Sequence, residues 1–133
     1  MELELIDLMK SLVCLFFTIL FLQSGLDKVF DWRGNRDFIV SHFSKTPLGF
    51  ASVPMLWVMT GLETLAGVLC GLGLVLGLLQ GAWIMATYGL LLSAVSFIAL
   101  FFGQRIAKDY EGAATLAIYF GVVLISLQLF LDF

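Results

Sequence analysis

Four long apolar runs restrict the fold of this chain more than any other feature of its sequence. They cover about residues 8–30, 54–79, 82–102 and 113–131. Each is close to the roughly 20 residues that a helix needs to cross about 30 Å of hydrocarbon. None alternates polar and apolar residues as a membrane barrel strand does. Because a helix satisfies its own backbone hydrogen bonds in lipid, the sequence predicts an all-α, four-helix transmembrane bundle that forms a single domain over residues 1–133.

The composition supports a chain that is immersed in the bilayer. Of its 133 residues, 61% are hydrophobic and 13% are charged, whereas a soluble domain has about 25% charged residues. No basic tract indicates nucleic-acid binding. The single histidine and the scattered carboxylates do not have the spacing of metal ligands, so we expect no metal site.

The linker between the first two apolar runs, residues 31–53, is the longest of the three linkers. It places Phe38, Ile39 and Phe43 among charged residues. This spacing is compatible with a short amphipathic helix on the membrane surface. An ordinary polar loop explains the same residues, and the sequence leaves both alternatives open. We expect His42 to be a solvated or interfacial residue of this linker.

Basic residues predict an orientation in the membrane. Six of the seven lie in or beside the first and third linkers, which share one side of a four-span protein: Lys28, Arg33, Arg36, Lys45, Arg105 and Lys108. Positively charged loops remain in the cytoplasm, so both termini are expected outside. The alternative is that some of these charges form a functional cluster, in which case they do not report the orientation.

Glycine spacing predicts how the helices pack. Gly67 and Gly71 are four residues apart, and Gly73, Gly77 and Gly81 continue at the same interval. Small residues at this spacing form a groove that another helix backbone can approach closely. We therefore expect the second span to be the central packing element of the bundle.

The two cysteines, Cys14 and Cys70, lie deep in apolar runs. Neither belongs to a CxxC pair or has an activating cation nearby in the sequence. We expect both to be buried free thiols that behave as small hydrophobic residues.

Glu63 is the most informative polar residue, because it lies well inside the second span. An ionisable group at that depth is costly and faces a bundle interior or a cavity. Helix rise places Gln23, Ser96 and Tyr119 at a similar depth, so one polar residue from each span could meet in one layer. Closer to the basic linkers, four further polar residues complete the candidate site: Lys28, Gln104, Arg105 and Asp109.

Two interpretations of this polar layer remain open. It is either a structural hydrogen-bond network that sets helix register, or a ligand or proton site that opens toward the basic linkers. In both cases we expect Glu63 to contact the first span, with Lys28 or Gln23 as its partner. No residue set in the sequence is assigned a catalytic role.

Three stretches carry a resemblance to a known family: SGLDKVFDW (24–32), GLETLAGVLCGLGL (61–74) and KDYEGAATLAIYF (108–120). Together they resemble the DoxX family of small four-helix membrane proteins, which is related to the MauE-like redox-associated membrane proteins. The resemblance covers essentially the whole chain. It rests on Gly25 and Lys28 at the end of the first span and on Glu63 in a glycine-rich second span, while Lys10 stands where many members have arginine.

The resemblance implies a role beside membrane redox enzymes, in a prokaryotic cytoplasmic membrane. We expect an accessory subunit of a quinone- or thiol-linked redox complex, with a quinone or lipid bound near Glu63. The chain has no CxxC motif, haem-ligand histidine pair or nucleotide motif, so we expect no intrinsic cofactor and place any redox cofactor in a partner. Two alternatives remain: a non-catalytic assembly or chaperone protein that packs against partner helices, and an enzyme or carrier that acts alone. The expected partners are the bilayer and either another membrane protein or a second copy.

Cysteine labelling tests the predicted orientation. A cysteine introduced at Asn35 should be protected from an impermeant reagent added outside the cell, and one introduced at Glu2 should react. The physical reason is the retention of basic linkers in the cytoplasm. Labelling at Asn35 from outside would refute the orientation but not the number of spans.

Overall fold

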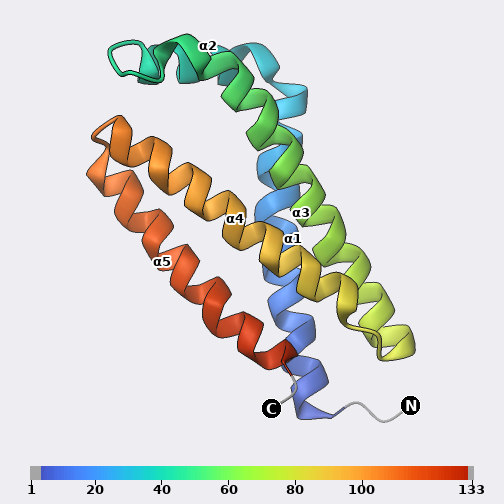
Figure 1. The fold of residues 1–133 in the computed structure, drawn as a ribbon. Helices are drawn as coiled ribbons and strands as arrows, with labels where there is room; N and C mark the ends of the chain where they lie inside the picture. Colours follow the sequence, from blue (N-terminus) through green and yellow to red (C-terminus); the bar gives the residue numbers. More distant parts are fainter. Residues whose placement is uncertain (1–3, 132–133) are drawn as a thin grey trace.

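The chain folds into helices throughout the part that the computed structural model describes, residues 4–131 (Figure 1). The elements are α1 (Leu5–Phe30), α2 (Trp32–Phe43), η1 (Gly49–Ala51), α3 (Ser52–Gln80), α4 (Ile84–Ile106), α5 (Tyr110–Leu127) and η2 (Gln128–Phe130). Helices α1, α3, α4 and α5 are long and apolar enough to span a membrane, with η1 extending α3 and η2 extending α5. The predicted all-α fold with four membrane-spanning helices is confirmed.

Local capping explains where the helices begin and end. At the start of α1, Glu4 and Asp7 form a reciprocal capping box, so the helix begins before the apolar run does. Gly81 adopts a left-handed conformation (φ 69°) that closes α3 and turns the chain toward α4. The Asp109 side chain accepts a hydrogen bond from Gly112 N and starts α5 at Tyr110, inside the segment predicted as a linker.

Helix α3 is the centre of the bundle, as the glycine spacing predicts. It packs against α1 on one side and α4 on the other, and α5 packs against α4. A methyl group added at Gly67 would lie 2.8 Å from the backbone nitrogen of Leu22 in α1, and one added at Gly73 would collide with Ala86 in α4. The small residues therefore serve close backbone contacts within the chain.

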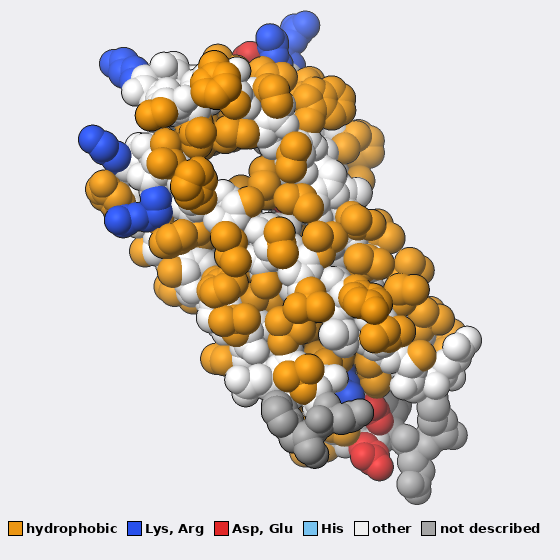
Figure 2. Space-filling view, in the orientation of Figure 1, with side chains coloured by type: hydrophobic (Ala, Val, Ile, Leu, Met, Phe, Trp, Pro, Cys, Tyr) orange, Lys and Arg blue, Asp and Glu red, His pale blue; other side chains and the backbone are white. Residues whose placement is uncertain are grey.

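Helix α2 crosses one end of the bundle, above the ends of the long helices (Figure 1). Of the two alternatives for the first linker, the short helix is the one present. Phe43 is buried, while Phe38 remains exposed. Lysine and arginine side chains gather at this end, and hydrophobic side chains cover the flanks (Figure 2).

The opposite end of the bundle is closed by contacts around Trp83. Its Nε1 donates to Asp7 Oδ1 at 3.2 Å, which ties the α3–α4 turn to the start of α1. The ammonium group of Lys10 lies 5.7 Å from the Trp83 ring centroid and 5.4 Å from that of Phe130. These cation–π contacts hold α1 against η2.

Both cysteines are fully buried free thiols, in agreement with the expectation from the sequence. They join Phe17, Phe21 and Phe97 in the apolar core or at its edge. This half of the bundle is packed with hydrocarbon and aromatic rings, so the polar chemistry lies toward the α2 end.

A pair of glycine substitutions in α3 tests the close packing. Gly67→Ala should lower the free energy of unfolding by about 1–3 kcal/mol, because the new methyl group meets the α1 backbone, which cannot yield cheaply. Gly61→Ala is the matched control in the same helix, since nothing lies within 4 Å of its added methyl group. Unfolding in mild detergent measures both. Equal stability of the two variants would contradict the packing described.

Candidate functional site

An ion pair joins α1 and α3 inside the bundle. Lys28 Nζ lies 2.8 Å from Glu63 Oε2, and the side chains are 16% and 3% exposed. Ser24 Oγ also donates to Glu63 Oε2, at 2.8 Å, and Lys28 Nζ donates to Ser24 Oγ at 2.9 Å. The three side chains form a closed triangle, which we call the Ser24–Lys28–Glu63 triad.

The sequence of α1 places the triad. Ser24 and Lys28 are four residues apart, so they share one face of the helix. Gly25 lies beside them, and a methyl group there would collide with Thr64 Oγ1 of α3. The absence of a side chain at Gly25 lets the two backbones come close enough for Lys28 to reach Glu63.

The triad pairs one carboxylate oxygen of Glu63, Oε2, with both Lys28 and Ser24. Within residues 4–131, Thr64 Oγ1 is the one fully buried side-chain nitrogen or oxygen atom without a hydrogen-bond partner. The contact predicted between Glu63 and the first span is present, and Lys28 is the partner rather than Gln23. These contacts at Glu63 Oε2 link α1 to α3.

The printed partners of Glu63 are Lys28 and Ser24, and the other predicted members of the polar layer make different contacts. Gln23 is exposed on α1, roughly 100° around the helix from Ser24. Ser96 is buried but donates to the carbonyl of Leu92 in its own helix, at 2.9 Å. Tyr119 stacks on Phe97, with ring centroids 5.6 Å apart. Helix rise predicts a depth along the helix but not the direction in which a side chain points.

The remaining predicted residues lie near the α4–α5 turn. Gln104 Oε1 pairs with His42 Nε2 of α2 at 2.8 Å, and Asp109 Oδ2 lies 3.9 Å from the same nitrogen. Arg105 is exposed and covers the Tyr110 ring at 4.7 Å. His42, which the sequence places in the first linker, is half-buried and links α2 to α4, because α2 folds back over the end of the bundle.

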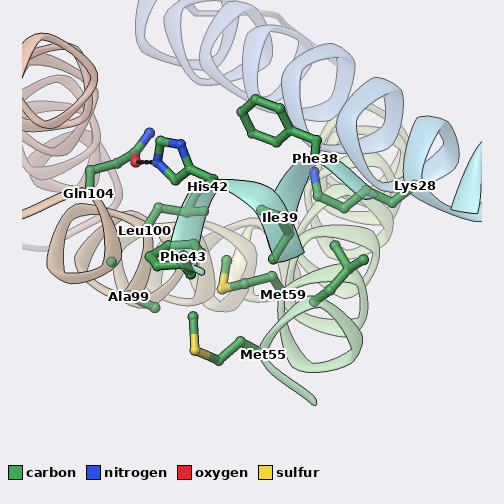
Figure 3. Close-up of a pocket in the computed structure, with 12 residues that line it drawn as sticks. Lys28, Phe38, Ile39, His42, Phe43, Met55, Met59, Ala99, Leu100 and Gln104 are labelled. Carbon is green, nitrogen blue, oxygen red and sulfur yellow. Dashed lines mark hydrogen bonds between the residues drawn. The ribbon is translucent and has the colours of Figure 1, made fainter. Parts of the chain in front are cut away.

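A cavity of about 100 Å³ lies beneath α2, and Figure 3 shows the side chains around it. The surface is hollowed below α2 in Figure 2. Its lining is mostly hydrocarbon and methionine, with three polar side chains from three helices. The twelve residues are Lys28, Phe38, Ile39, His42, Phe43, Met55, Leu56, Met59, Ala99, Leu100, Gly103 and Gln104. We call it the α2 cavity.

A larger apolar groove adjoins the α2 cavity between α3 and α4. Its volume is about 450 Å³, and it shares four lining residues with the cavity, Met55, Met59, Ala99 and Gly103. The rest of its wall is apolar: Leu48, Ala51, Pro54, Val58 and Phe102. The two spaces therefore lie side by side, one partly polar and one hydrocarbon.

Lys28 therefore takes part in two features of the structure, and no local pattern in the sequence indicated both of them. It belongs to the triad and also lines the α2 cavity. Ser24 was missed, although its i, i+4 spacing from Lys28 is a usable signal. The pairing of His42 with Gln104 was not predicted, because the docking of α2 depends on contacts that are distant in the sequence. Among the described residues, no three His, Cys, Asp or Glu side chains are grouped to hold a metal ion.

Comparisons of the chain with protein-family models, with curated proteins and with solved structures find no match.

Removing the Glu63 charge tests the triad. Glu63→Gln should lower the free energy of unfolding by about 3 kcal/mol, because it leaves the Lys28 ammonium without its buried counter-ion. The double variant Glu63→Gln with Lys28→Met should recover much of that loss, since no unpaired charge remains. A double-mutant cycle by detergent unfolding measures the coupling. Additive losses would show that the two charges do not stabilise each other.

Proposed function

We propose that this chain is a non-catalytic accessory subunit of a membrane redox complex, and that it binds a quinone or lipid at the Lys28 wall of the α2 cavity. One observation carries the proposal: Lys28 pairs with the buried Glu63 and also lines a cavity. Ionisable groups within membrane spans are retained for such roles more often than for packing.

The family resemblance supports the redox part of the proposal. Lys28 and Glu63, two of the residues that resemble the DoxX pattern, form the pair between α1 and α3. The chemistry of electron transfer belongs to a cofactor in the partner, and this chain supplies binding and orientation. The basic α2 end faces the cytoplasm in this proposal, and the membrane is a prokaryotic cytoplasmic membrane.

A second candidate is an assembly protein that packs against partner helices. The outward faces of α1 and α5 favour it, because only 17% of each span's apolar window is buried within the chain. An assembly protein would need the triad for its own stability and would not need an occupied α2 cavity.

Purification from the source membrane in mild detergent separates the two candidates. The accessory subunit should co-purify with a redox protein and with a quinone or lipid, identified by mass spectrometry. The double variant Glu63→Gln with Lys28→Met should still fold and should lose most of the small molecule, because the polar wall of the cavity is gone. Partner retention with no bound small molecule in the wild-type chain would favour the assembly protein.

A further inference from the structure

The triad leaves one hydrogen-bond donor of Lys28 free. An ammonium group has three N–H donors, and those of Lys28 reach Glu63 Oε2 and Ser24 Oγ. No third acceptor contacts Lys28 Nζ among the described residues. Since Lys28 lines the α2 cavity, this remaining donor is available to a molecule that enters it.

The charge of Lys28 is already compensated. Glu63 lies 2.8 Å from the ammonium nitrogen, and on the far side of the cavity Asp109 lies 3.9 Å from His42. An anionic head group would therefore meet no uncompensated cation, and it would lose its hydration on entering a largely apolar space. A neutral carbonyl oxygen can accept from Lys28 without that cost.

The space around Lys28 fits a molecule with a small head and one hydrocarbon chain. The α2 cavity alone, at about 100 Å³, is smaller than most small-molecule sites, which measure about 300–1,000 Å³. The adjoining groove adds about 450 Å³ of apolar space. Met55 and Met59 line both spaces, and their flexible thioether side chains adapt to an irregular hydrocarbon chain.

A second groove provides an internal comparison. Phe97, Ile98, Phe101, Ala117 and Phe120 enclose about 190 Å³ between α4 and α5. Its lining has no polar side chain, so it offers hydrocarbon contact but nothing to hold a head group. Any lipid chain can occupy this groove. The α2 cavity and the adjoining α3–α4 groove instead offer a polar group for a head and an apolar space for a chain.

We propose that the α2 cavity and the α3–α4 groove bind one neutral single-chain amphiphile, whose carbonyl oxygen accepts a hydrogen bond from Lys28 and whose chain lies along Met55, Met59 and Ala99. The proposal rests on the proposed function only in placing the ligand at Lys28. It concerns binding by the purified chain and needs no partner protein.

Photolabelling of the purified full chain in mild detergent tests the proposal. The probe is a monoacylglycerol with a diazirine at the end of its chain, and peptide mass spectrometry locates the adducts. We expect adducts on the α3–α4 groove around Val58, Met59 and Ala99. Competitors of equal chain length are monodecanoylglycerol, a decyl benzoquinone, decanoate and decyl phosphate. The neutral competitors should displace the probe at about tenfold lower concentration than the anionic ones.

Matched substitutions test the groove. Ala99→Phe, at an exposed position that lines the groove, should reduce labelling about tenfold, as expected for loss of a well-filled contact. Val58→Phe fills the same groove and should reduce labelling in the same way. It replaces Ala99→Phe in the experiment if that variant folds poorly. Ala117→Phe makes the same change in the α4–α5 groove and should leave labelling at α3 unchanged.

Three results would overturn the proposal: anionic competitors as effective as neutral ones, equal loss of labelling in the Ala99→Phe and Ala117→Phe variants, or adducts spread equally over both grooves. The last two would indicate ordinary lipid contact. If the benzoquinone competes more strongly than the glyceride, the natural ligand is a quinone. If the glyceride competes more strongly, the ligand is a lipid with an ester carbonyl. A failure here leaves co-purification with a redox partner unaffected, so the two proposals can fail separately.

Discussion

The close approach of α1 to α3 is the constraint on which the rest of the structure depends. Gly25 meets Thr64 and Gly67 meets Leu22 with no room for a methyl group on either glycine. In lipid there is little hydrophobic gain from helix association, so close packing and polar contacts must hold the helices together. The short distance between the α1 and α3 backbones allows their side chains to pack closely. It also brings Lys28 within hydrogen-bonding distance of Glu63.

The ion pair then links the bundle to the space beneath α2. Glu63 is almost completely buried, while Lys28 is partly exposed and lines the α2 cavity. A single side chain thus joins the packing of α1 on α3 to the surface that a ligand would meet. Helix α2, which covers the cavity, is held by a separate contact. His42 pairs with Gln104 and links α2 to the end of α4.

Part of the site could be predicted from sequence, and the rest could not. Glu63 stands out because a carboxylate is costly in an apolar run, and Lys28 was a natural partner at the end of the neighbouring span. Gln23 and Tyr119 are not among the partners of Glu63 Oε2. Depth along a helix follows from residue count, whereas direction depends on which face meets a neighbour. The α2 cavity had no sequence signal, since its walls come from helices that are far apart in the chain.

The sequence by itself determined the four long apolar helices, their approximate ends and the central position of the glycine-rich span. These properties are local: span length, apolar composition and the four-residue spacing of small residues act within one helix. Only the tertiary structure decided that α2 folds across the bundle, that Ser24 rather than Gln23 joins Glu63, and that Lys28 borders a cavity. Each of these depends on the rotation and tilt of one helix against another, which side-chain packing sets and no single segment contains.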